Sequence, residues 1–169
     1  MNELRCYEPM SSPLGDITLF ANDEALTAIH FNGQRYETAI GNSMRRNPQH
    51  PALRAAKAQL TEYFAGKRKT FDLPLASIGT SFQRAIWQAI AGVPYGETIA
   101  YRVLAQHAGV PDAIRAAGAA TGRNPWAIVV PCHRIVGSDG TLTGYAGGLD
   151  RKRALLALES TQAPLTLAA

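Results

Sequence analysis

Residues 80–121 read TSFQRAIWQAIAGVPYGETIAYRVLAQHAGVPDAIRAAGAAT, and this stretch decides the fold of the second half of the chain. Thr80 and Gln83 form a capping-box pattern that opens a helix, and Gly92 and Pro94 follow where that helix should end. The apolar side chains at positions 82, 86 and 90 recur at helical spacing. One face of this helix should therefore pack on a hydrophobic core.

Two shorter helices follow in the same stretch. Thr98 is placed to cap the first, which should run to about residue 108, and Asp112 is placed to cap the second, over residues 113–121. The Gly-Val-Pro sequence at 109–111 forms a tight turn between them. Two short helices joined by such a turn predict a helix-turn-helix.

The last of these helices carries almost no side chains. Residues 113–121 are alanine or glycine at six positions, and Arg115 is the one long polar residue in the middle. Small residues allow close packing against neighbouring helices, and taken alone this is the more common explanation. They also let a backbone approach a narrow groove of nucleic acid, with Arg115 as the side chain that probes it.

The first part of the chain predicts strands followed by a helix. Strand-like segments over residues 17–22 and 25–31 meet at an Asn-Asp-Glu turn. Pro51 marks the start of a helix that stops at Gly66, and residues 71–75 predict one more strand.

Together these patterns predict two domains. An α/β domain, with a small antiparallel sheet plus a helix, should occupy residues 1–77 as a scaffold. A mostly α-helical domain that contains the helix-turn-helix should follow over residues 78–169.

The composition is that of a globular protein. The 169 residues are 46% apolar and 18% charged, and the net charge of +4 permits a polyanionic partner without requiring one. We see no secretory signal and no run long enough to span a membrane, so a cytoplasmic protein is expected. Cys6 and Cys132 should then be free thiols, and with four scattered histidines they give no zinc-ligand spacing.

The sequence AIVVPCHRI at 127–135 contains the clearest chemical signal. Cys132 stands beside His133 at the end of an apolar run that predicts a buried strand, and such a setting suits an activated thiolate with a lowered pKa. Adjacent residues on a strand point to opposite faces. Contact between the two side chains therefore requires a turn at this point or a bridging water.

Glu159 is the candidate for a third group that orients the imidazole. It ends a helix predicted over residues 151–158, which Asp150 can cap. The alternative for Cys132 is a buried structural cysteine, the usual fate of a free cysteine. The charge-bearing residues that follow Cys132 fit an apolar core poorly, which disfavours this alternative.

Two further stretches lie close to this signal in the sequence. The sequence GYAGG at 144–148 is either a flexible connection or a loop whose backbone N–H groups line a pocket, with Tyr145 as a wall. The sequence RKR at 151–153 falls in the first turn of the last helix, where positive charge costs a few tenths of a kcal/mol (~0.3) per group. A solvated charge run is the default interpretation, and a nearby anion would explain the placement better.

These features together resemble the O6-alkylguanine-DNA alkyltransferase family, the methylated-DNA–protein-cysteine methyltransferases. The match is close over residues 79–159. It includes PYGET at 94–98, AY at 100–101, GRNP at 122–125, PCHRI at 131–135, GYAGG at 144–148 and LALE at 156–159. The first domain matches more loosely, mainly at the SPLG sequence of residues 12–15.

The resemblance implies catalytic roles for five residues. Cys132 is the alkyl acceptor, His133 deprotonates it through a water, and Glu159 orients His133. Asn124 holds the active-site turn. Tyr101 donates a proton to the leaving guanine and crowds the phosphate backbone.

The resemblance also implies contacts with DNA and with the damaged base. Arg115 fills the gap left by a flipped nucleotide as the helix-turn-helix enters the minor groove. The DNA-binding residues expected on this basis are Arg115, Ala116, Gly118, Thr98 and Arg123. In the pocket, Tyr145 flanks the base, the N–H of Ala146 faces O6, and the carbonyls of Cys132 and Ile135 recognise the guanine amino group. Lys152 matches a polar residue near the active site of relatives.

The function implied is repair of duplex DNA. The protein would flip O6-alkylguanine, and O4-alkylthymine as a further candidate, out of the duplex and transfer the alkyl group irreversibly to Cys132, once per molecule. No cofactor or metal enters this chemistry, and a monomer is expected, with cooperativity on DNA left open. Positions that hold a structural zinc in some animal members are Glu3, Asn22 and Thr27 here, which disfavours zinc. Adaptive-response regulators carry an extra cysteine-rich domain for which these 169 residues leave no room, so we expect no transcriptional role.

Two alternatives remain from other functional classes. A non-catalytic lesion binder would flag damage for other repair systems, and the presence of Cys132 argues against it. A cysteine hydrolase would use Cys132 and His133, but no glycine-rich nucleophile elbow is visible and the helix-turn-helix would have no purpose.

Overall fold

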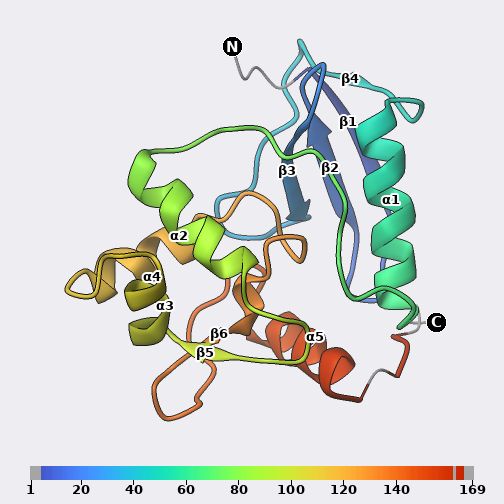
Figure 1. Cartoon of the computed structure of the whole chain (residues 1–169). Coiled ribbons are helices and arrows are strands. Elements are labelled where there is room, and N and C mark those ends of the chain that lie inside the picture. The colour runs from blue at the N-terminus through green and yellow to red at the C-terminus, as the bar shows by residue number, and fades with distance from the viewer. Residues whose placement is uncertain (1–4, 162, 166–169) are drawn as a thin grey trace.

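The computed structural model describes residues 5–161 and 163–165. Its N-terminal part is a four-stranded sheet in the order β3-β2-β1-β4, with helix α1 (Pro51–Phe64) packed against it (Figure 1). The strands are β1 (Cys6–Met10), β2 (Ile17–Ala21), β3 (Leu26–Phe31) and β4 (Arg45–Arg46). β2 pairs antiparallel with both β1 and β3, whereas β4 pairs parallel with β1.

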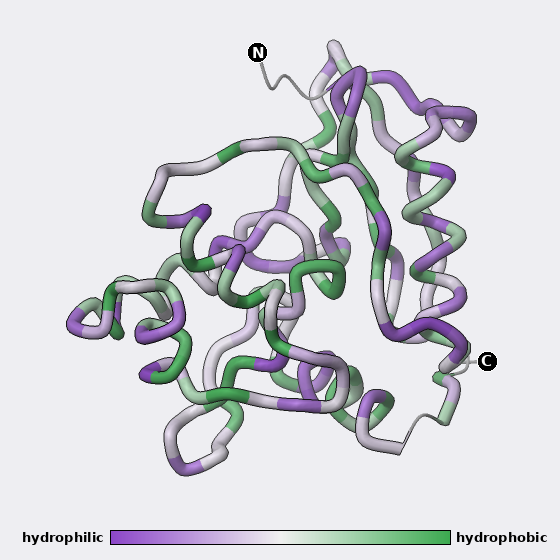
Figure 2. The backbone as a smooth tube through the Cα atoms, in the orientation of Figure 1, coloured by the Kyte–Doolittle hydropathy of each residue, from purple (hydrophilic) through white to green (hydrophobic). Residues whose placement is uncertain are grey.

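Burial along the strands explains how the sheet is held. Every residue of β2 and β3 is buried, so both faces of these two strands are covered, whereas β1 alternates between buried and partly exposed positions. Figure 2 shows mostly apolar residues along β2 and β3 and a mixture of polar and apolar ones along α1. α1 buries an apolar face of Leu53, Ala56, Leu60 and Phe64 against the sheet.

The prediction of this part was correct for two strands and the helix. β1 and β4 were not predicted, and the strand expected over residues 71–75 was wrong. That segment makes a single bridge between Leu75 and Leu26. Pro74 has no N–H to donate, so the segment cannot continue a regular ladder along β3.

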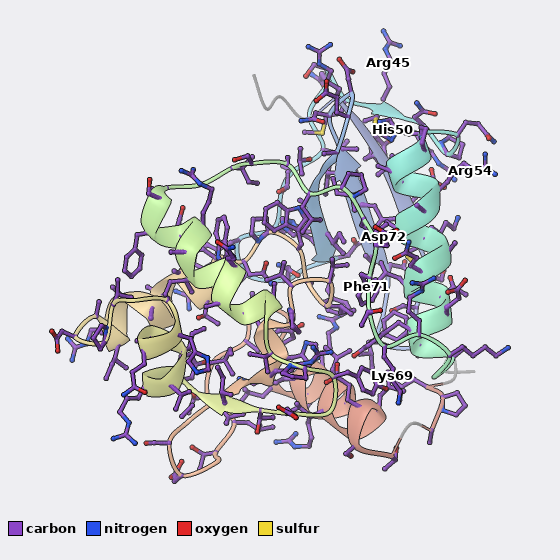
Figure 3. All side chains as sticks on the ribbon, viewed as in Figure 1. Arg45, His50, Arg54, Lys69, Phe71 and Asp72 are labelled. Carbon is purple, nitrogen blue, oxygen red and sulfur yellow. The ribbon has the colours of Figure 1, made fainter. Side chains whose placement is uncertain are left out.

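The segment after α1 returns along the side of that helix. The side chain of Gln59 exchanges two hydrogen bonds with the backbone of Asp72, each 2.9 Å long. Figure 3 shows Phe71 and Asp72 beside α1 accordingly. The chain then passes into the helical part of the molecule.

The second part is mostly helical, which confirms the expected fold class. Its helices are α2 (Ser81–Ala91), α3 (Tyr101–His107), α4 (Ile114–Gly122) and α5 (Leu149–Thr161). A short parallel pair, β5 (Ile99–Ala100) with β6 (Ile135–Val136), and a 3₁₀ turn, η1 (Cys132–Arg134), lie between them. Among the described residues, no helix is long and apolar enough to cross a membrane.

The capping box of α2 is confirmed. Thr80 Oγ1 accepts the N–H of Gln83 at 3.1 Å, and the Gln83 side chain accepts the N–H of Thr80 at 3.0 Å. The other predicted caps were wrong. Thr98 is separated from α3 by β5, so Ala100 begins that helix without a side-chain cap.

The starts of α4 and α5 also differ from the prediction. The N–H of Ala113 donates to the carbonyl of Val110 at 2.9 Å, so the turn runs past Asp112 and Ala113 is the N-cap, without a side-chain hydrogen bond. α5 begins at Leu149, two residues before the predicted start, which puts Asp150 in its first turn instead of at the cap. An acidic side chain in the first turn interacts favourably with the helix dipole.

Candidate active site

Cys132 is presented by a buried turn, and the strand predicted before it was wrong. Residues 127–130 form turns, and Cys132 begins η1. Ile128 has φ of 71°, a left-handed conformation that costs a β-branched residue at least about 1 kcal/mol. A run of apolar residues matches a buried turn as well as a buried strand, and among the described residues no strand pairs with 127–130, since the nearby bridge joins Trp126 to Ile29.

Asn124 fastens this turn. Its Nδ2 donates to the Val130 carbonyl at 2.7 Å and lies 3.2 Å from Cys132 Sγ, while its Oδ1 accepts the N–H of Trp126 at 3.0 Å. Asn124 is buried, so water does not compete for these hydrogen bonds. Asn124 thus contacts both ends of the turn and the sulfur of Cys132.

His133 and Glu159 meet in the interior. His133 Nε2 lies 2.7 Å from Glu159 Oε1, and the two side chains are 0% and 1% exposed. Arg134 donates to both carboxylate oxygens at 2.9 Å and to the Val93 carbonyl at 2.7 Å. Because a buried carboxylate needs a counter-charge, Arg134 explains how Glu159 stays ionised in the core.

The N-terminal part of the chain supplies a further donor. Tyr63, on α1 and fully buried, donates from its hydroxyl to Glu159 Oε1 at 2.8 Å. Nothing in the sequence indicates this contact, because Tyr63 lies beside Leu60 and Phe64 and belongs to the apolar face of a helix. Its partner is 96 residues away.

The electrostatics of the site point to a neutral imidazole. Burial alone would raise the pKa of Glu159, but the hydrogen bonds from His133 and Arg134 and the charge of Arg134 outweigh it and lower the pKa to about 2. Burial lowers the pKa of His133. A neutral His133 donates its Nε2–H to Glu159, and its Nδ1 is buried without a hydrogen-bond partner among the described residues. That nitrogen is free to accept a proton.

Cys132 is a thiol at rest, which corrects the expectation of a lowered pKa. Burial raises the pKa of the sulfur, and the hydrogen bond from Asn124 and the charge of Lys152 offset this only in part. The pKa is high because the sulfur has left water. Activation therefore requires a base.

Lys152 is buried, so the interpretation of residues 151–153 as a solvated charge run was wrong for this residue. Its Nζ donates to the carbonyls of Ile135, Thr143 and Gly144, at 2.6, 3.0 and 3.3 Å. It ties the loop that leads to Tyr145 onto β6. The Ile135 carbonyl is engaged by Lys152 in this state, and Ile135 does not line the cavity beside Cys132.

The two arginines that flank Lys152 differ from it, and from each other, in burial and in hydrogen-bond partners. Arg151 is half-buried and donates to the carbonyls of Leu14 and Gly147 at 2.8 and 3.0 Å. It therefore joins the N-terminal part to residues 144–148, which we call the pocket loop. Arg153 is exposed and pairs with Asp150 at 3.2 Å.

A cavity of about 700 Å³ opens onto Cys132. Tyr101, Tyr145, Ala146 and the small residues of α4, including Ala116 and Gly118, line it. The Tyr145 hydroxyl is buried without a partner among the described residues. The Tyr101 hydroxyl donates to the Thr143 carbonyl at 3.2 Å, and burial raises the pKa of Tyr101. Both phenols are therefore protonated at neutral pH.

The remaining predicted residues lie apart from the cavity or at its mouth. Arg115 is exposed on α4 and does not line the cavity. Arg123 stands at the mouth, with its guanidinium carbon 3.6 Å from the centre of the Tyr36 ring. Thr98 is exposed and lies in a separate depression against α5. Sequence reasoning missed Arg35 and Tyr36, which line the cavity from the loop after β3 and belong to no recognised motif.

The fold and the site together define a class of protein. It is a cysteine-nucleophile enzyme whose reactive sulfur borders a cavity lined by Tyr101, the first residue of α3, and by small residues of α4. Comparison with known proteins makes the assignment specific. Residues 6–77 match the ribonuclease-like domain of 6-O-methylguanine DNA methyltransferase, and residues 81–161 match its DNA-binding domain.

Relatives match along nearly the whole chain. The methylated-DNA–protein-cysteine methyltransferase of Mycolicibacterium paratuberculosis is 47% identical over 161 residues, which cover 95% of this chain and 96% of that protein. The protein of the same name from Methanosarcina acetivorans is 44% identical over 155 residues, covering 92% and 98%. The crystal structure of Mycobacterium tuberculosis OGT in complex with DNA has a TM-score of 0.86 at 43% identity, covering 94% of this chain and 95% of that one.

The chain belongs to the 6-O-methylguanine DNA methyltransferase family, the methylated-DNA–protein-cysteine methyltransferases. It is therefore a DNA-repair enzyme of the class that transfers an alkyl group to a cysteine. The two-domain architecture of that family, a small sheet domain followed by a helical domain, is the one described above.

Proposed function

We propose that this protein flips O6-alkylguanine out of duplex DNA and transfers the alkyl group to its own Cys132, once per molecule. The observation that carries the proposal is the arrangement of three buried groups. Cys132 borders the cavity, and neighbouring His133 is neutral, with its Nδ1 free and its Nε2 bonded to Glu159. This is the arrangement of a thiol beside a general base.

The proton steps follow from these groups. His133 Nδ1 takes the proton of Cys132 through one water, and Glu159 stabilises the imidazolium that forms. The sulfur attacks the alkyl carbon, the bond from that carbon to guanine O6 breaks, and a thioether forms. Tyr101 gives its hydroxyl proton to the departing guanine, and the proton held by His133 returns to the Tyr101 phenolate through solvent, so no net proton is gained or lost. Tyr101 lines the cavity that opens onto Cys132, and its phenol is protonated at neutral pH, so a proton is available when the base arrives.

The product should not be turned over. A thioether has no carbonyl for water to attack, so hydrolysis cannot release the alkyl group. The chain has two cysteines, and Cys6 lies in β1 with its sulfur 3.7 Å from the Ala21 carbonyl. It does not line the cavity and cannot accept the group from Cys132. Each molecule therefore acts once.

DNA binding is assigned to the side of the cavity formed by α4. Ala116 and Gly118 leave the backbone of that helix open to a groove, and we assign them to the minor groove as a helix-turn-helix with α3. Extrusion of a base costs on the order of a few kcal/mol. Arg115, exposed on the same helix, would fill the vacated space and offset part of that cost. We expect a monomer on DNA.

The cavity supports a range of substrates. Ala146 and the glycines around it put no large side chain beside Tyr145, and a volume of about 700 Å³ exceeds that of one base. Alkyl groups larger than methyl, and O4-alkylthymine, are therefore included in the proposal.

Intact mass tests the proposal directly. The protein is mixed with a duplex oligonucleotide that contains one O6-methylguanine, and we expect a mass gain of one methyl group, mapped to Cys132 by peptide fragmentation. Excess oligonucleotide should give one equivalent and no more. An absent adduct would leave a non-catalytic lesion binder, whereas methyl transfer beyond one equivalent would contradict the single-use mechanism.

A further inference from the structure

The mouth of the cavity holds three side chains that the proposed reaction does not use. Arg35 and Tyr36 come from the loop after β3, and Arg123 follows α4, yet all three line the cavity that contains Cys132. The guanidinium carbons of Arg123 and Arg35 lie 3.6 and 4.9 Å from the centre of the Tyr36 ring. Two positive charges are thus held against one aromatic ring at the entrance to the site.

The loop that carries Tyr36 is fixed by its own hydrogen bonds. These join Arg35 N–H to the Ala146 carbonyl at 3.0 Å, Gly33 N–H to Glu37 Oε2 at 2.9 Å, and Thr38 N–H to His30 Nδ1 at 2.9 Å. The first of these bonds attaches the loop to the pocket loop beside Tyr145. The position of the ring is therefore set by both parts of the chain.

Tyr36 adopts a conformation that an aromatic residue rarely has. Its φ is 60°, in the left-handed region, and 44% of its surface is exposed. Such a backbone costs about 1 kcal/mol or more and persists only where the surroundings impose it, often at binding sites. Packing in the core does not explain an exposed ring held in this way.

The two guanidinium groups lack acidic partners. Within residues 5–161 and 163–165, the ion pairs include neither Arg35 nor Arg123. Glu37, the acid of the same loop, accepts the N–H of Gly33. A guanidinium stacked on a ring keeps the N–H groups of its edge available, and this planar fork matches a phosphate. A bound anion would also relieve the repulsion between the two charges.

We propose that Arg35 and Arg123, supported by Tyr36, bind a backbone phosphate of the DNA strand that carries the damaged nucleotide. Because α4 lines the same cavity, the strand would contact both the N-terminal domain and the helical domain beside the extruded base. The inference rests on the proposed function and assigns the N-terminal domain a part in DNA binding. The ligand group is a phosphodiester, and no base is read.

Salt dependence of binding tests the subsite. Duplex affinity is measured by fluorescence anisotropy over a series of salt concentrations, for wild type and Arg35→Gln. Loss of one phosphate contact should weaken binding roughly fivefold to tenfold near 0.1 M salt and reduce the slope of log K against log salt by about 1. Arg35→Lys keeps the charge and should keep most of the slope.

Arg45→Gln is the matched control. It removes the same charge from an exposed arginine of β4, which Figure 3 shows pointing away from the molecule at the sheet end near the start of α1. Its slope should equal that of wild type. An Arg35→Gln slope equal to wild type would overturn the subsite, and so would weaker binding with an unchanged slope, which would indicate a structural loss.

One further measurement separates failure of the proposed alkyl transfer from failure of the phosphate subsite. The same protein preparations are treated with O6-methylguanine duplex, and wild type and Arg45→Gln should each gain one methyl group. A wild type that binds DNA and gains none contradicts the proposed function. A wild type that reacts, with an Arg35→Gln variant that binds DNA as wild type does, contradicts the phosphate subsite alone.

Discussion

The inner end of the site and the mouth of its cavity are built in opposite ways. Around Glu159 each charge is matched: the carboxylate accepts from His133, Arg134 and Tyr63, and all four side chains are buried. At the mouth, Arg35 and Arg123 stack on an exposed ring, and neither appears among the ion pairs of the described residues. The interior therefore holds its charges in one hydrogen-bonded geometry, whereas the mouth carries positive charge that no acidic side chain of the described residues pairs with.

Removal of the sulfur should have the largest effect. Cys132→Ser should lose alkyl transfer completely, because a serine hydroxyl beside a neutral imidazole is a far weaker nucleophile. Its DNA affinity should stay at the wild-type value, since the mouth and α4 are intact. Intact mass and anisotropy check the two expectations, and weakened DNA binding would mean that Cys132 also matters structurally.

Loss of the carboxylate charge of Glu159 should destabilise the buried cluster at the inner end of the site. Glu159→Gln leaves the Arg134 guanidinium buried without its counter-charge, which should reduce the free energy of unfolding by about 3–5 kcal/mol. Urea denaturation measures the change. Glu97→Gln, an exposed position, is the control and should be close to neutral. A Glu159→Gln protein as stable as wild type would contradict the matched-charge description.

Loss of the α4 arginine should affect duplex DNA alone. Arg115→Ala should slow repair of a duplex roughly tenfold or more, because nothing replaces the extruded nucleotide. Reaction with free O6-benzylguanine should change much less, since no extrusion is needed. Arg54→Ala, an exposed arginine on the outer side of α1 (Figure 3), is the charge-matched control. Equal losses on duplex and free base would contradict the role of Arg115 in base flipping.

Loss of the hydrogen bond from Tyr63 to Glu159 should have a smaller effect on the inner end of the site. Tyr63→Phe removes one donor from Glu159 Oε1 and should cost about 1 kcal/mol of stability. The carboxylate then becomes a stronger acceptor, which raises the pKa of His133. Since only neutral His133 accepts the thiol proton, the acid limb of the pH–rate profile should move to higher pH. Tyr7→Phe is the control, and an unmoved profile would limit Tyr63 to packing.

Sequence reasoning identified side chains that meet at the site better than it predicted their local backbone. Cys132, His133 and Glu159 were recognised from their motifs, and the capping box of α2 follows a local rule that tertiary contacts did not override. The apolar run before Cys132 was misassigned as a strand, because periodicity does not separate a buried strand from a buried turn. Thr98 failed as a cap because pairing of β5 with β6 intervened.

The long-range contacts could not have been predicted. Lys152 is buried because carbonyls from two separate segments converge on its Nζ, and no local pattern encodes that convergence. Tyr63 and Tyr36 read as an ordinary core residue and an ordinary loop residue. Their importance depends on how the sheet domain sits against the helical part, and one sequence alone does not contain that information.

The most direct test of the account is the protonation state of His133 in the resting protein. Nitrogen-15 NMR of labelled histidine distinguishes the neutral forms from the imidazolium. At pH 7 we predict a neutral His133 that carries its proton on Nε2, toward Glu159, with Nδ1 unprotonated and Cys132 as a thiol. An imidazolium with both nitrogens protonated, paired with a thiolate, would contradict the proposal that His133 acts as the base.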